Sequence, residues 1–185
     1  TVRGKKMKLL MSLKLVLILT FFTSLSWAEE VVTEEISSSK KWSAYKMTGH
    51  SAWGTEACVA STQGEDSIVE IYSEKVGSVY TEPTIQVLFS GVAEQVFSAT
   101  IETDKGGRKA MTLASQPAAA GMQAVMSRLK DRESLIRAIR GHNSLTVRLR
   151  DAKGKTIKRL RFSLSGSSKT VKAQTAACAL EISKL

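Results

Sequence analysis

The sequence predicts a mainly β fold, an antiparallel sandwich or barrel-like domain with two or three short helices and one disulfide. Three observations lead to this class. Short runs of alternating apolar and polar residues, separated by turn residues, recur about every 10–14 residues after residue 42. Helical periodicity is confined to short stretches in the second half of the chain. The two cysteines, Cys58 and Cys178, lie far enough apart to connect the two ends of this domain.

The first part of the domain predicts a series of short strands. Side chains of alternating type favour half-buried strands, and Gly, Pro and Asp residues mark the turns between them. The expected strands cover residues 42–47, 57–60, 67–72, 85–89, 97–101 and 110–113. The segment Asp104-Lys105-Gly106-Gly107 has the composition of a hairpin turn between the last two strands. Trp42 and Trp53 bracket the first strand and are expected to pack in the core or at its rim.

Two segments in the middle of the domain have helical spacing. Residues 119–130 are ambiguous, because their apolar side chains recur with helical spacing whereas Pro117 and Gly121 disfavour a helix. The next segment is clearer, since Asp131 is a suitable N-cap and Gly141 stands where a C′ glycine belongs. We therefore expect a helix from Asp131 to Gly141 and leave the preceding segment open.

The last third of the chain predicts a strand pair. Residues 145–149 alternate between apolar and polar types, residues 151–154 form a turn, and residues 157–164 return. The apolar residues of the returning strand stand at both odd and even positions, and strict alternation would place them on opposite faces. We therefore expect a β-bulge near Lys158 and Arg159 that brings them to one face.

The two cysteines are expected to form a disulfide. A last helix begins at Ser165-Gly166-Ser167 and places Val171 and Cys178 on one face, where Cys58 of an early strand can meet Cys178. Such a bond closes a loop of about 120 residues and is worth roughly 4–5 kcal/mol in the chain-entropy model. The alternatives are a buried free thiol and a nucleophilic cysteine.

The N-terminal residues indicate export. Basic residues precede an apolar run from Leu15 to Phe22, and the small residues of Ser26-Trp27-Ala28 follow it. We expect residues 1–28 to be an N-terminal extension and a signal peptide cleaved after Ala28, with Met7 or Met11 as the start. Residues 29–41 are polar and are expected to form a flexible arm, and residues 42–185 a single β-rich domain. The mature protein is then periplasmic or secreted, with no span in the membrane.

Basic residues are concentrated on the predicted strand pair. The full chain has a net charge of +10, but five basic residues belong to the leader, which leaves +5 for the mature chain. Arg137 and Arg140 lie on the helix just before the hairpin. The basic residues of the hairpin are Arg148, Arg150, Lys153, Lys155, Lys158, Arg159 and Arg161.

This basic hairpin has two interpretations. It is either a solvated edge that resists aggregation, or a contact for an anionic partner such as lipopolysaccharide phosphate or an acidic protein. We select Arg148, Arg150, Lys158, Arg159 and Arg161 as candidate binding residues. Nucleic acid is disfavoured, because the basic residues are not interleaved with aromatic ones and because the protein is expected outside the cytoplasm.

Known catalytic patterns are missing from the sequence. His50 and His142 have no partners at metal-ligand spacing, and neither cysteine lies in a nucleophile motif. Phosphate-loop and Gly-x-Ser-x-Gly spacings are also missing. We therefore expect a non-enzymatic protein that has no cofactor and no metal. A cysteine-dependent cell-wall hydrolase is the enzymatic alternative.

Three segments resemble the invasion-associated locus B family of exported bacterial proteins. They are Trp53-Gly54-Thr55-Glu56-Ala57-Cys58, Leu145-Thr146-Val147-Arg148-Leu149 and Phe162-Ser163-Leu164-Ser165-Gly166-Ser167. The resemblance implies a small β-rich periplasmic or secreted protein with a role in virulence, and it implies no catalytic residues. The expected function is an interaction with an envelope or host protein or with an anionic envelope component. Inhibition or stabilisation of an envelope enzyme is the second possibility.

Overall fold

The computed structural model describes residues 32–48, 56–113 and 122–180. The first strands are β1 (Val32–Ser39), β2 (Trp42–Thr48), β3 (Glu56–Gln63), β4 (Ser67–Val76), β5 (Val79–Tyr80) and β6 (Thr84–Phe89). They are followed by β7 (Ser98–Thr103), β8 (Lys109–Leu113), β9 (Gln123–Ser127), β10 (Ser144–Arg150) and β11 (Thr156–Ser163). The helical elements are the 3-10 turn η2 (Leu129–Asp131) and the helices α1 (Arg132–Gly141) and α2 (Ser167–Ala177).

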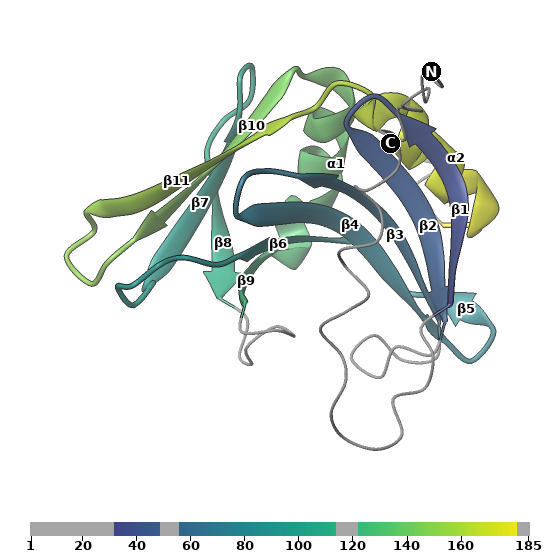
Figure 1. Cartoon of the computed structure of the whole chain (residues 1–185), viewed down its shortest axis with the longest axis horizontal. Coiled ribbons are helices and arrows are strands. Elements are labelled where there is room, and N and C mark those ends of the chain that lie inside the picture. Colours follow the sequence, from purple (N-terminus) through teal and green to yellow (C-terminus); the bar gives the residue numbers. More distant parts are fainter. Residues whose placement is uncertain (1–31, 49–55, 114–121, 181–185) are drawn as a thin grey trace, which may run out of the picture.

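The strands form one antiparallel sheet with the order β1-β2-β3-β4-β6-β9-β8-β7-β10-β11, and β5 pairs with β4. The sheet curves strongly, and both helices lie on the same side of it (Figure 1). It does not close, since β1 and β11 remain its two edges. The end of β11 nevertheless returns to β2, where Trp42 Nε1 donates to the Ser163 carbonyl oxygen at 3.0 Å. The predicted class, mainly antiparallel β with short helices, is confirmed.

The core lies between the inner face of the sheet, which faces the helices, and the helices themselves. It runs along most of the sheet, because the long strands other than β1 turn alternate apolar side chains to this face. Trp42, Phe89 and Ile101 are fully buried there. Leu135, Ile136 and Ile139 of α1 and Val171 of α2 complete the cluster. Trp42 packs in the core as expected, while Trp53 lies outside the described residues.

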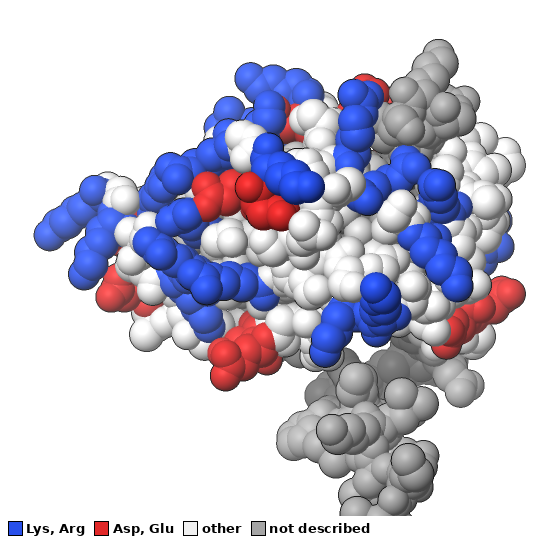
Figure 2. Space-filling model, turned by 90° about the horizontal axis from the view of Figure 1, so that it is seen from above, with Lys and Arg blue, Asp and Glu red and all other residues white. Residues whose placement is uncertain are grey.

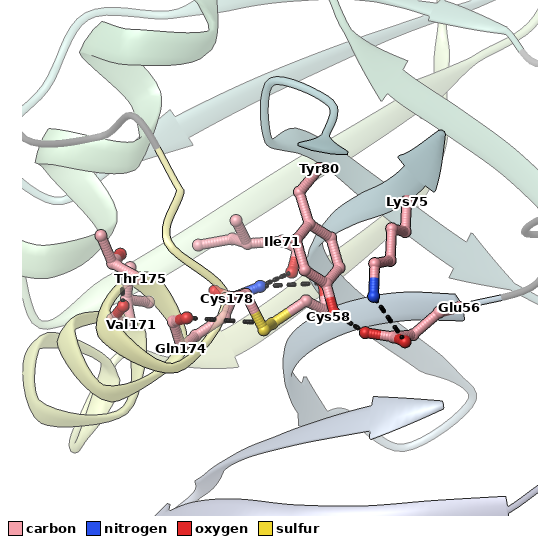
Figure 3. The surroundings of a disulfide bond; sticks show 9 residues. All are labelled: Glu56, Cys58, Ile71, Lys75, Tyr80, Val171, Gln174, Thr175 and Cys178. Atoms are coloured by element: carbon pink, nitrogen blue, oxygen red, sulfur yellow. Dashed lines mark hydrogen bonds and ion pairs between the residues drawn. A yellow bond between two sulfur atoms is a disulfide. The ribbon is translucent and has the colours of Figure 1, made fainter. Parts of the chain in front are cut away.

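The predicted disulfide between Cys58 and Cys178 is present, and it joins β3 to the end of α2 (Figure 3). Gln174, one turn earlier on α2, reinforces this connection: its Nε2 donates to the carbonyl oxygens of Cys58 at 3.0 Å and Ile71 at 2.7 Å. The helix is therefore tied to both β3 and β4 by one covalent bond and by hydrogen bonds buried beside it.

The prediction of a flexible arm over residues 29–41 is wrong for the part that forms β1. Val32–Ser39 pairs with β2 along its length, with a register shift between Glu35 and Ser37. Most of its side chains are exposed or half-buried. An edge strand held mainly by its backbone hydrogen bonds needs no apolar period, and for that reason the sequence pattern did not reveal it.

The ambiguous segment 119–130 contains a strand rather than a helix over its described residues. Gln123–Ser127 forms β9 between β6 and β8, and Val125 is buried in the core. The helical spacing of the apolar residues in this segment arose by coincidence, because the segment is short. The strand pairing from both sides outweighs the weak helical preference.

Two local features differ in detail from the expectations. The bulge in β11 falls at Ile157, because the register passes from Leu149 opposite Lys158 to Arg150 opposite Thr156. Asp131 precedes α1 as predicted, but its side chain makes no capping hydrogen bond. Its carboxylate instead forms an ion pair with Lys109 at 3.2 Å.

Gly166, at the start of α2, is a position where any side chain is expected to be costly. Its φ is +98°, and a Cβ added there would lie 1.9 Å from the Ser39 carbonyl oxygen of β1. We expect Gly166→Ala to lower the free energy of unfolding by about 2–3 kcal/mol, from backbone strain and displacement of β1. Gly154→Ala is the matched control, because Gly154 has φ +79° with no atom within 4 Å of an added Cβ. Equal losses for the two variants in urea denaturation would show that the contact with β1 is unimportant.

Candidate binding face

Four of the five predicted binding residues lie together on the outer face of the sheet, opposite the helices. On β10 the apolar residues Leu145, Val147 and Leu149 are buried inward, so Arg148 and Arg150 lie on the outer face. On β11 Arg159 stands directly opposite Arg148, and Arg161 stands opposite Thr146. Lys and Arg side chains gather over the end of the molecule that the β10–β11 hairpin forms (Figure 2).

Lys158, the fifth predicted residue, is not part of this group. It lies opposite Leu149 and so belongs to the other side of the strand pair. Its Nζ donates to the Ser90 carbonyl oxygen at 2.9 Å and lies 3.4 Å from Asp66 Oδ2. With a side chain only 24% exposed, Lys158 attaches the hairpin to the turns beside β4 and β6.

Arg148 is compensated by an acidic neighbour that the sequence reasoning missed. Glu102 of β7 accepts hydrogen bonds from Nε and Nη2 of Arg148, and its second oxygen accepts one from Arg108 Nε at 3.1 Å. Hydrogen bonds from Arg148 and then Arg108 hold the pKa of Glu102 below its usual value. Arg148 therefore fixes the geometry of the face more than it adds free positive charge.

Arg150, Arg159 and Arg161 differ from Arg148 in their electrostatic surroundings, and we call them the arginine face. Within residues 32–48, 56–113 and 122–180, no carboxylate forms an ion pair with any of the three. Arg159 and Arg161 are exposed and Arg150 is half-buried. A guanidinium group offers several N–H donors in a planar fork, which suits phosphate and carboxylate oxygens.

The hairpin turn next to the arginine face is held in place by Asp151. Its Oδ1 accepts hydrogen bonds from the backbone N–H groups of Lys153 and Lys155, both at 2.9 Å. The turn thus carries two further exposed lysines on a fixed backbone.

Glu70 is the second feature that sequence reasoning missed. It lies on the outer face of β4, between Ser61 and Gln86 of the neighbouring strands, and is only 3% exposed. Its Oε2 has no hydrogen-bond partner among the described residues. Burial raises the pKa of Glu70 to about 7. The sequence carried no signal for this burial, because alternation with the inward Val69 and Ile71 predicts an outward, solvated Glu70.

The described histidine has a structural environment. His142 follows α1, and its Nδ1 lies 2.5 Å from Thr103 Oγ1. Beside it, Asp104 Oδ1 accepts a hydrogen bond from the Asn143 N–H at 3.0 Å. His50 lies outside the described residues.

The described residues contain neither a metal-ligating cluster nor a membrane-spanning helix. In the described part of the chain, no group of three or more His, Cys, Asp and Glu side chains is placed to hold a metal ion. No helix in the same residues is long and apolar enough to cross a membrane. The predicted signal peptide, residues 1–28, lies outside what the structure describes.

Comparison with known proteins finds a similar fold in one solved structure. No family model matches the sequence. No curated protein matches it either. The crystal structure of invasion associated protein B from Bartonella henselae is similar, with a TM-score of 0.49 and 12% sequence identity. The match covers 79% of this chain and 97% of that one. The similarity lies in the fold, with little shared sequence.

Proposed function

We propose that this chain is an exported, non-enzymatic interaction protein of the bacterial envelope, which binds an anionic partner through the arginine face. The observation that carries the proposal is the grouping of Arg150, Arg159 and Arg161 on one side of a strand pair without acidic partners in the described residues. The disulfide supports export, because such bonds persist in oxidising compartments. The leader-like sequence of residues 1–28 supports it further.

The surroundings of the arginine face favour binding over simple solvation. Arg159 lies on β11, whose strand partner β10 is itself paired with β7, so the face rests on a continuous ladder. The ion pair between Arg148 and Glu102 fixes the centre of this ladder. Binding then costs little ordering of the backbone, which leaves more of the electrostatic attraction as affinity.

The competing interpretation assigns these arginines to the protection of an edge strand. β11 is an edge of the sheet, and charged side chains on an edge oppose pairing with a second chain. The two interpretations differ in one measurable respect, since only the binding face loses a partner when its charge is reversed.

We expect the variant Arg150→Glu/Arg159→Glu/Arg161→Glu to lose capture of lipopolysaccharide by at least about tenfold in affinity, because three attractive charges become repulsive. Surface plasmon resonance with immobilised lipopolysaccharide measures this loss. Arg137→Glu/Lys169→Glu/Lys172→Glu is the matched control, with the same change of net charge on the two helices. Equal binding by both variants, each with the wild-type circular dichroism spectrum, would exclude the arginine face. Loss of binding in both variants would show that the net charge alone causes the effect.

The resemblance to the invasion-associated locus B family adds a proposal about biological context. A role in contact between bacterium and host is compatible with an exported binding protein that presents arginines on a strand pair. Deletion of the protein is expected to reduce host-cell entry, and the triple charge-reversal variant is expected not to restore it.

A further inference from the structure

A shallow, open groove lies on the described surface, and two of its six lining residues are apolar. It has a volume of about 500 Å³, and its lining residues lie at the end of β9, on η2 and on β8. Met126 and Leu129 supply its apolar surface, and the Leu129 side chain is 71% exposed. Leu129 and the half-buried Met126 together form a small apolar surface that can contact the apolar part of a ligand.

Two cations flank this groove. Arg128 and Lys130 line it on either side of Leu129, and both are exposed. Neither forms an ion pair with a carboxylate in the described ranges of the chain. An apolar floor with positive charges at its margin is complementary to a hydrocarbon chain that carries an anionic group.

The groove and the arginine face belong to the same outer face of the sheet. Arg150 pairs with Ser98, and Thr112 pairs with Met126. Ala99 pairs with Met111, so in this antiparallel pair Ser98 lies opposite Thr112. One row across the four strands therefore contains Arg150, Ser98, Thr112 and Met126. Three strand spacings therefore separate Arg150 from Met126, or roughly 14 Å.

The surface between them is lined by small side chains. Ser98 and Thr100 of β7 and Ala110 and Thr112 of β8 occupy the outer positions there. Each is exposed or half-buried, so a chain lying across them meets no large side chain from these two strands. The outer face thus offers a cationic end, a shallow middle, and a second end where Met126 and Leu129 lie between Arg128 and Lys130.

We propose that this line binds one phosphate-bearing membrane lipid, with its phosphate on the arginine face and its acyl chain in the groove. The proposal rests on the proposed function, and it names the chemical class of the anionic partner. The acyl chain gains from removal of Met126 and Leu129 from water, and the phosphate gains charge-assisted hydrogen bonds from the arginines.

Calorimetric titration of the full chain with dodecyl phosphate, below its micelle concentration, tests the proposal. We expect the wild type to bind dodecyl phosphate at least about tenfold more tightly than methyl phosphate or the uncharged dodecyl maltoside. Leu129→Asp is expected to weaken dodecyl phosphate binding by at least about tenfold. The matched control is Val79→Asp, since Val79 is 67% exposed on β5. It is expected to bind as the wild type does.

The outcomes separate this inference from the proposed function. If Leu129→Asp and Val79→Asp bind dodecyl phosphate equally, the groove is not the site of the acyl chain. If methyl phosphate binds as tightly as dodecyl phosphate but requires the arginines, the lipid proposal fails and the anionic-partner function stands. If dodecyl phosphate binding ignores the Arg150→Glu/Arg159→Glu/Arg161→Glu change, the phosphate does not lie on the arginine face and the lipid proposal fails, while capture of lipopolysaccharide still tests the proposed function.

Discussion

Replacement of Cys58 and Cys178 by alanine is expected to lower the free energy of unfolding by about 5 kcal/mol. The disulfide joins residues separated by 120 positions, and its removal frees the unfolded chain to explore many more conformations. The loss is comparable to the whole stability of many small domains. Urea denaturation followed by circular dichroism measures it.

A reducing agent provides the control for this prediction. It is expected to lower the urea midpoint of the wild type to that of the double variant and to leave the variant unchanged. If the double variant unfolds at the wild-type urea concentration, the disulfide does not constrain the unfolded chain as the chain-entropy model requires, and the prediction is wrong.

The replacement Glu70→Gln is expected to abolish a loss of stability at rising pH. Burial raises the pKa of Glu70 to about 7 in the folded protein, whereas an unfolded glutamate titrates near its ordinary value. Between these two pKa values the folded state binds more protons than the unfolded state, so stability falls as the pH rises. The wild type should lose about 2–3 kcal/mol between about pH 5 and pH 8.

Urea denaturation across this pH range distinguishes the wild type from Glu70→Gln. The variant keeps the size of the side chain and carries no charge, so its stability should be nearly constant over the range. Glu56, Glu102 and Asp104 have lowered pKa values, and their contributions are lost only at lower pH. A wild-type slope that persists in Glu70→Gln would show that another group causes it.

The sequence predicted those elements that have their own periodic or capping signals. Residues 85–89 and 145–149 form strands within β6 and β10, and α1 ends near the predicted place, although Gly141 is its last residue and His142 its C-cap, rather than Gly141 lying at C′. The pairing of Cys58 with Cys178 followed from the compartment and from the face of the last helix. Strand β1 was missed because its stability comes from pairing with β2, which leaves no apolar pattern in its own residues.

The candidate site was predicted only in part, because the sequence shows the alternation along each strand but not the pairing between strands. Alternation along β10 correctly placed Arg148 and Arg150 on the outer face. The same alternation along β11 removes Lys158 from the group, because Lys158 lies next to the outward Arg159 and opposite the inward Leu149. The partner of Arg148, Glu102, lies 46 positions away along the chain, so only the pairing of β7 with β10 reveals it.

Vesicle binding at two salt concentrations tests the role of the arginine face most directly. The comparison is between the wild type and Arg150→Gln/Arg159→Gln/Arg161→Gln, which removes the positive charges without adding negative ones. Vesicles of phosphatidylglycerol and phosphatidylcholine supply the anionic surface, and pure phosphatidylcholine supplies the neutral reference. We predict that the wild type binds only the anionic vesicles, more weakly at high salt, and that the folded variant does not bind them. Binding by the variant equal to that of the wild type would contradict the assignment.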